Sequence, residues 1–241
     1  MNDLQRKLLL ATLGPCLWLQ GRYVRRVTPR LPEPDGPRMG QSGHGPVLRL
    51  LIAGDSAAAG VGASSQAQGL SGQLVHRLAA QFSVQWQLAA VTGHDSPALH
   101  GLLYDLPDQP LDVVVVSIGV NDVTALRSPR QWVHWQATLA NLIYQRFGAR
   151  LIIHSALPPM HAFTALPQPL RWYFGRWAKE MNRQLAIDLQ GRPRRALHRA
   201  HMDEPSQGLA SDGFHPGPRG YAVWAEGLSE HIFAEMAGRA D

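Results

Sequence analysis

Four short apolar runs along the chain predict buried β-strands, and each run is soon followed by Gly or Pro. The runs cover residues 47–53, 84–91, 112–118 and 151–154. Their length and their lack of polar alternation are typical of parallel strands that are covered on both faces. Elsewhere, apolar residues recur at helical spacing. This spacing predicts helices over residues 69–81, 97–104, 129–147, 170–189 and 219–236.

Strand and helix patterns alternate from residue 47 onward. Such alternation predicts an α/β fold with a mainly parallel sheet and helices on both of its faces. In this kind of sheet the loops that follow the strands gather at the carboxyl edge, where ligands bind. Ser56, Gly93 and Asn121 each follow a different predicted strand. We therefore expect these three residues to lie at one edge of the sheet.

Residues 1–46 differ from the rest of the chain in charge and composition. The chain has a net charge of +5, and residues 1–40 account for +4 of it, with seven basic and three acidic side chains. Because the remainder is almost neutral, a basic face for nucleic acid is not expected. Residues 28–46 are rich in Pro and Gly and predict a linker or a surface strap. We therefore divide the chain into an amino-terminal segment, 1–46, and a globular domain, 47–241.

Residues 8–30 combine an apolar stretch with arginines. The stretch is too short to predict a transmembrane helix, and Gly14-Pro15 interrupts it. It also does not resemble a signal peptide, because no small-residue cleavage site follows it. Two interpretations stay open: contact with an anionic membrane surface, or a helix packed on the protein's own core. The single cysteine, Cys16, requires no oxidising compartment. We expect a cytoplasmic protein, with membrane association left open and a secreted or periplasmic location as the alternative.

The residues that carry candidate chemistry begin with Gly54-Asp55-Ser56, directly after the first predicted strand. A serine hydroxyl becomes a useful nucleophile when a histidine removes its proton and a carboxylate orients that histidine. Asp212 and His215 lie three residues apart in a turn-rich segment near the carboxyl end. One short loop of this kind can supply both the base and the group that orients it. Taken alone, each motif is more typical of a polar turn that caps a helix.

Ester hydrolysis also needs hydrogen-bond donors where negative charge develops on the carbonyl oxygen. The backbone N–H groups of Ser56 and Gly93 suit this role, because a glycine lets the backbone approach a ligand closely. Asn121 can add a side-chain N–H. These three residues are our candidates for an oxyanion hole.

Taken together, four sequence blocks resemble the SGNH (GDSL-type) hydrolases. They are Gly54-Asp55-Ser56, Gly93, Gly119-x-Asn121-Asp122 and Asp212-x-x-His215, in that order along residues 47–236. The resemblance implies a three-layer α/β/α, flavodoxin-like fold and hydrolysis of carboxylic esters or thioesters. It assigns Ser56 as nucleophile, His215 as base and Asp212 as its orienting group. It also implies an oxyanion hole of Ser56, Gly93 and Asn121, and it casts Asp55 and Asp122 as braces for their loops.

The resemblance predicts a serine esterase that acts on small acyl or lipid esters without a cofactor or a metal. His198 and His201 have no suitable acidic or cysteine neighbours for a metal site. Two alternatives stay open: a carbohydrate O-deacetylase, and a non-catalytic binding domain on the same scaffold. Residues 158–174 mix apolar, aromatic and proline residues, which suits either a wall or lid of the acyl pocket or a buried crossover.

Overall fold

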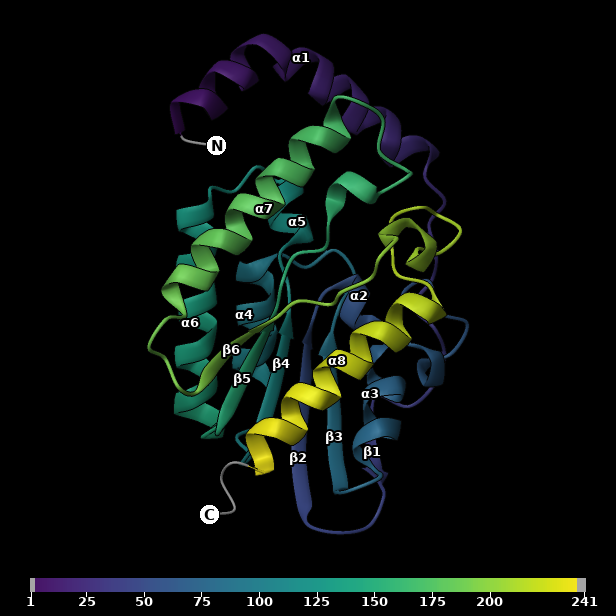
Figure 1. Ribbon diagram of the computed structural model, residues 1–241, viewed down its shortest axis with the longest axis vertical. Coiled ribbons are helices and arrows are strands. Elements are labelled where there is room, and N and C mark those ends of the chain that lie inside the picture. The colour runs from purple at the N-terminus through teal and green to yellow at the C-terminus, as the bar shows by residue number, and fades with distance from the viewer. Residues whose placement is uncertain (1–2, 238–241) are drawn as a thin grey trace.

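In the computed structural model, which describes residues 3–237, a six-stranded sheet carries helices on both faces (Figure 1). The strand order is β1-β3-β2-β4-β5-β6. β1 runs antiparallel to β3, and every other neighbouring pair is parallel. The predicted α/β fold is therefore confirmed. The strands β1 to β6 span Met39–Ser42, Val47–Gly54, Ser83–Ala90, Val113–Ser117, Leu151–Ser155 and Arg195–His198.

The helices form two layers around the sheet. α3 and α8 cover one face, and α4 and α6 cover the other (Figure 1). The longer helices α1, α3, α4, α6, α7 and α8 span Asp3–Val27, Leu70–Leu78, Ser96–Asp105, Pro129–Phe147, Leu170–Asp188 and Pro218–Ala237. The short helices α2 and α5 span Ser56–Ala59 and Val120–Thr124, and η1, η2 and η3 span Gln66–Gln68, Met160–Ala162 and Pro205–Gly208. In the described part of the chain, no helix has the length and apolar character needed to span a membrane.

The four predicted strands correspond to β2, β3, β4 and β5, with ends shifted by at most one residue. β4 is buried along its whole length, as its run of β-branched residues indicated. The sequence pattern missed the two edge strands. β1 lies within the predicted linker and pairs with β3, although all four of its residues are exposed. A four-residue strand without apolar alternation leaves no signal in the sequence, since only pairing with its neighbour defines it. The division at residue 46 stays a prediction.

α1 continues without interruption through Gly14 and Pro15, contrary to the expected break. A proline inside a helix removes one backbone hydrogen bond and is costly. Packing offsets this cost, because Leu17 and Val24 are buried in a cluster formed mainly by α7 and the segment before it. One side of α1 is thus packed on the protein's own core.

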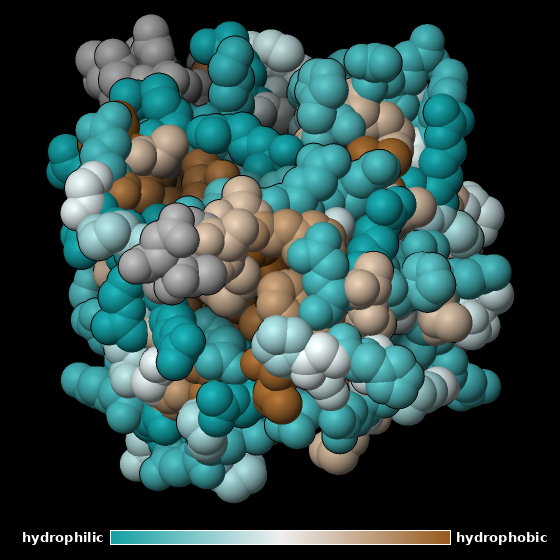
Figure 2. Space-filling view, turned by 60° about the horizontal axis from the view of Figure 1, so that its bottom comes forward, coloured by the Kyte–Doolittle hydropathy of each residue, from teal (hydrophilic) through white to brown (hydrophobic). Residues whose placement is uncertain are grey.

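β2 lies at the point where the strand order reverses. From β2 the chain moves to β3 on one side, and later to β4 on the other. In open α/β sheets this switch point leaves a crevice beyond the carboxyl ends of the strands. Figure 2 brings the bottom of Figure 1, where the opposite edge of the sheet lies, forward and shows a hydrophobic area among mostly hydrophilic residues. The candidate residues gather at the carboxyl edge.

Candidate active site

Ser56 stands at the sharp turn between β2 and α2. At Gly54, the last residue of β2, an added Cβ would come within 2.0 Å of the Ser117 carbonyl oxygen on β4. Only glycine fits there without moving the strands. Asp55 then caps α2, because its Oδ1 accepts a hydrogen bond from Ala57 N at 3.1 Å. The Gly-Asp-Ser sequence therefore ends the strand and places Ser56 at the first position of α2, on the carboxyl edge of the sheet.

The loop before α8 folds back on itself around Asp212. Asp212 Oδ1 accepts hydrogen bonds from the backbone N–H groups of Phe214 and His215, each at 3.0 Å. Gly213 adopts φ +64°, a conformation that favours glycine, and a Cβ there would lie 2.3 Å from Thr164 Oγ1. This tight turn leaves Asp212 Oδ2 free to face the ring of His215.

His215 bridges Asp212 and Ser56. Its Nδ1 lies 2.6 Å from Asp212 Oδ2, and its Nε2 lies 2.9 Å from Ser56 Oγ. Burial opposes ionisation of Asp212, but hydrogen bonds from the His215 ring and the two backbone amides outweigh it and lower the pKa of this carboxyl. An ionised Asp212 accepts a hydrogen bond from Nδ1–H, so Nε2 is left to accept a hydrogen bond from the Ser56 hydroxyl. The structure thus brings together three of the residues singled out in the sequence.

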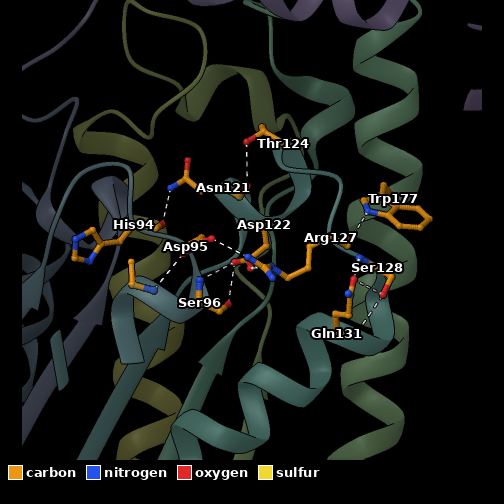
Figure 3. A network of polar contacts seen from close by, with 11 residues as sticks. His94, Asp95, Ser96, Asn121, Asp122, Thr124, Arg127, Ser128, Gln131 and Trp177 are labelled. Atoms are coloured by element: carbon orange, nitrogen blue, oxygen red, sulfur yellow. Dashed lines mark hydrogen bonds and ion pairs between the residues drawn. The ribbon is translucent and has the colours of Figure 1, made fainter. Parts of the chain in front are cut away.

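Gly93 and Asn121 lie in the connections that follow β3 and β4, the two neighbours of β2. Gly93 is in a loop, and Asn121 is in the short helix α5. Gly93 is exposed, with φ +87°. The Asn121 side-chain amide donates a hydrogen bond to the His94 carbonyl oxygen at 2.7 Å (Figure 3). This contact joins the two loops directly and leaves the second N–H of the Asn121 amide without an assigned partner. Gly119, which precedes α5, packs so tightly that a Cβ would meet Trp132 Nε1 at 2.6 Å.

A buried ion-pair network holds the same two loops together (Figure 3). Asp122 Oδ2 accepts hydrogen bonds from the backbone N–H and the hydroxyl of Ser96, at 3.1 and 2.9 Å. Arg127 contacts both Asp122 Oδ1 at 2.7 Å and Asp95 Oδ2 at 2.8 Å. The contact with Asp122 is an ion pair rather than an aligned hydrogen bond. Arg127 therefore links the loop after Gly93 to the loop that carries Asn121.

The sequence alone did not reveal the roles of His94, Ser96 and Arg127. Asp95-Ser96-Pro97 carries a local signal, since an Asp N-cap followed by an early Pro is typical of a helix start. Asp95 does cap α4, and its Oδ1 accepts from Ala98 N at 3.1 Å. The link to Asp122 is tertiary, so no sequence pattern could have indicated it.

Asp55 is almost fully buried beneath Ser56. Burial is the main cause that raises the pKa of this carboxyl to about 7, and the nearby Asp122 adds to it. The hydrogen bond from Ala57 N and the proximity of His215 act in the opposite direction. The Asp55 carboxyl therefore stabilises the turn through its hydrogen bond with Ala57 N, and it can be protonated near neutral pH.

A cavity of about 810 Å³ opens beside Ser56 and His215. Its walls are mainly apolar, and they include Gly119 but neither Gly93 nor Asn121 among the described lining residues. Part of the segment 158–174 forms one wall, through residues 158, 159 and 161–163. Further along the segment, Leu166 and Leu170 are buried in the core. The segment is thus a cavity wall at its start and a buried crossover further on. Within residues 3–237, no group of three or more His, Cys, Asp or Glu side chains could hold a metal ion.

Two sequence comparisons connect this chain to known proteins. The sequence model of the GDSL-like Lipase/Acylhydrolase family matches residues 52–223. The chain is also similar to the GDSL-like esterase Rv1075c of Mycobacterium tuberculosis, with 32% identity over 171 residues. That match covers 63% of this chain and 53% of the relative, so this chain spans about half of that protein's length.

Solved structures share the fold at low sequence identity. The lipase Lip_vut3 from a goat rumen metagenome superposes with a TM-score of 0.62 and 18% identity, over 80% of this chain and 100% of that one. Est24, a carbohydrate acetylesterase from Sinorhizobium meliloti, has a TM-score of 0.57 and 17% identity, over 78% and 99% of the two chains. The fold, the four sequence blocks and the family match over most of its length place this chain in the GDSL-like lipase/acylhydrolase family, as the sequence resemblance indicated.

Proposed function

We propose that this protein is a serine hydrolase that cleaves carboxylic esters through an acyl-enzyme on Ser56. The observation that carries the proposal is the continuous hydrogen-bonded series from Asp212 through His215 to Ser56 Oγ, with contacts of 2.6 and 2.9 Å. Ser56 and His215 border a cavity large enough for a small-molecule ester. The geometry matches the roles of nucleophile, base and orienting carboxylate.

In the proposed reaction, Ser56 Oγ attacks the ester carbonyl carbon while His215 Nε2 takes the hydroxyl proton. The bond between the carbonyl carbon and the alcohol oxygen then breaks, and His215 returns the proton to the leaving alcohol. Water attacks the acyl-enzyme in the same way and releases the acid, with Ser56 protonated again. Asp212 stays ionised throughout and stabilises the positive charge that forms on His215.

We assign the oxyanion hole to the backbone N–H groups of Ser56 and Gly93 and to the side chain of Asn121. Two observations support this assignment. Within the described chain, neither the Ser56 nor the Gly93 amide donates a hydrogen bond, whereas Thr92 N and His94 N, on either side of Gly93, both do. The Asn121 side-chain amide donates one N–H to the His94 carbonyl oxygen, and its second N–H can donate to a ligand. Loss of one such donor typically costs about 3–4 kcal/mol of barrier.

The cavity favours acyl esters with a substantial apolar part over acetate esters. Its walls are mainly apolar, and the rings of Phe163 and Phe214 lie tilted to each other with centroids 4.8 Å apart, the Phe214 ring being next to His215. Small lipid esters and medium-chain acyl esters fit these apolar walls better than sugar acetates, whose alcohol portion is polar. Carbohydrate O-deacetylation is the runner-up, because the same catalytic groups would serve it.

A fluorophosphonate probe tests the catalytic assignment. We expect covalent labelling at Ser56 and none in a Ser56→Ala variant that keeps its fold, as judged by circular dichroism and thermal unfolding. Labelling elsewhere, or ester turnover that persists in the folded variant, would contradict the assignment. A folded wild-type protein that neither labels nor turns over esters would identify a non-catalytic binding domain.

A panel of p-nitrophenyl esters tests the substrate class. We expect kcat/KM to rise from acetate to medium-chain esters as the cavity fills. A strict preference for acetate would contradict the proposed substrate class and favour the deacetylase alternative. The expected cytoplasmic location and the contact of residues 8–30 with a membrane are separate questions, and both stay predictions.

A further inference from the structure

Large apolar side chains are exposed mainly on α1 and α7. Six of the eleven exposed large hydrophobic residues in the described chain belong to these two helices: Trp18, Leu19, Tyr23, Val27, Trp172 and Ile187. Trp18, Leu19 and Tyr23 are each about three-fifths exposed. They lie on the side of α1 away from Leu17 and Val24, which are buried against the body of the protein. α1 is therefore apolar on its outer side as well as its inner one.

Arginines stack on the exposed tryptophans of both helices. Arg22 lies over the Trp18 ring with 4.9 Å to its centroid, and Arg176 lies over the Trp172 ring with 5.6 Å. Both pairs are spaced i, i+4 on one helix, so each presents a cation and an indole side by side. This combination is typical of membrane interfaces, where indole rings sit at the level of the headgroups and arginines contact lipid phosphates.

The two pairs belong to adjoining parts of the molecule. Gln20 of α1 accepts a hydrogen bond from Leu170 N at 3.0 Å and donates one to the Gln168 carbonyl oxygen at 2.6 Å. Trp172 lies in the first turn of α7, directly after these contacts. In Figure 1, α1 crosses the amino end of α7 at the top of the molecule. We call the outer side of α1 together with the first two turns of α7 the α1–α7 surface.

The charges that residues 9–30 bring to this surface have one sign. Residues 9–30 contain four arginines and no acidic residue. Arg22, Arg25, Arg26 and Arg30 are all exposed, and no ion pair of theirs appears within the described residues. The rest of the chain beyond residue 40 is nearly neutral. An anionic partner is therefore favoured, whereas a second copy of the same surface would be repelled.

We propose that the α1–α7 surface docks the protein on an anionic lipid bilayer. Trp18, Leu19 and Trp172 enter the interfacial region, and the arginines contact lipid phosphates. Contact with a bilayer explains why apolar and cationic side chains share this surface, since water alone would favour only the cations.

Docking in this position also places the catalytic cavity close to the lipid. Lys179, which lines the cavity, lies seven residues beyond Trp172, a rise of about 10 Å along α7. A lipid-borne ester then has a short path from the bilayer into the cavity. This part of the inference rests on the proposed function, whereas the docking itself does not.

Vesicle sedimentation with the full-length protein tests the docking. One set of vesicles is phosphatidylcholine alone, and the other contains equal parts of phosphatidylcholine and phosphatidylglycerol. We expect binding to the anionic vesicles that weakens as salt is raised. Arg22→Gln with Arg26→Gln should weaken this binding roughly 25-fold, because each arginine near the surface contributes about fivefold. Trp18→Ser should weaken binding to the anionic vesicles as well.

The matched control is Arg130→Gln with Arg150→Gln, which removes the same charge from other exposed positions. We expect this control to bind vesicles as the wild type does, and the arginine and Trp18 variants to hydrolyse a short soluble ester at the wild-type rate. Equal binding by both double variants, or no binding to anionic vesicles, would overturn the proposal. Self-association that Trp18→Ser abolishes, without vesicle binding, would identify a second copy as the occupant instead. Ser56→Ala should still bind vesicles, so a failure of the hydrolase assignment is distinguishable from a failure of docking.

Discussion

Replacing Asp212 by asparagine tests the group that determines the tautomer of His215. The new side chain has nearly the same shape. Its oxygen can still accept hydrogen bonds from the backbone N–H groups of Phe214 and His215, which lie 3.0 Å from Asp212 Oδ1 in the wild type. The loop should therefore keep its fold. The group that faces His215 Nδ1 becomes an NH₂ donor, where the wild type has a carboxylate oxygen at 2.6 Å.

This exchange reverses the tautomer of His215. Nδ1 must then accept a hydrogen bond from the amide N–H, so the ring proton moves to Nε2, which faces Ser56 Oγ at 2.9 Å. In that tautomer Nε2 cannot take the serine proton, and no carboxylate stabilises the imidazolium. In serine hydrolases with this arrangement the corresponding change lowers kcat about 10⁴-fold. At about 1.4 kcal/mol for each factor of ten, the barrier should rise by about 5.5 kcal/mol.

The assay is steady-state hydrolysis of a p-nitrophenyl ester by wild type and D212N. We expect the loss in kcat, with little change in KM, because the substrate cavity is untouched. The matched control is D203N, which removes a carboxylate from an exposed position beside His201. D203N should turn over the ester at the wild-type rate.

A D212N variant that is folded and retains more than a tenth of wild-type kcat would refute the assignment of Asp212. Unfolding of D212N would instead show that the charge of Asp212, rather than its shape, holds the loop. Thermal unfolding separates these outcomes. D212A then provides a second test, because it removes the orienting group without supplying a competing donor.

Two further predictions concern stability. His154 is fully buried between Gln136 Oε1 and Arg195 Nε, and burial lowers its pKa to about 3. The unfolded chain then binds more protons below pH 6.5, so the free energy of unfolding should fall toward acid by up to about 1.4 kcal/mol per pH unit from this group. Urea unfolding of H154Q between pH 7 and 4 should show a correspondingly smaller slope, and an unchanged slope would contradict this account. For the second, R127M leaves the buried Asp122 carboxylate unpaired and should cost roughly 3 kcal/mol in urea unfolding. R127M with D122N should recover part of that loss, and no recovery would contradict the pairing.

Local patterns were sufficient for the four inner strands of the sheet and for the location of the candidate site. β4 is a run of valines that suits only a strand covered on both faces, and the helix over residues 129–147 has the bounds that its spacing indicated. The Gly54-Asp55-Ser56 turn and the Asp212-x-x-His215 loop are local as well. Each depends on hydrogen bonds between residues two or three positions apart in the chain, so the local sequence is sufficient to predict both.

Only tertiary structure decided how these local pieces meet. β1 has no strand signal of its own and exists through its pairing with β3. The 2.9 Å contact between His215 and Ser56 joins groups 159 residues apart. Arg127 became part of the site because the loops after β3 and β4 are neighbours in the sheet.

The amino-terminal segment shows the same division. The sequence determined that residues 8–30 are apolar and basic at once, and left open whether they meet the protein or a membrane. The structure places Leu17 and Val24 against the α7 cluster and leaves Trp18 exposed. The physical reason is that hydrophobicity is a property of each residue, whereas burial depends on which surface lies opposite. A helix with apolar side chains on both sides can bury only one side against the core of the same protein.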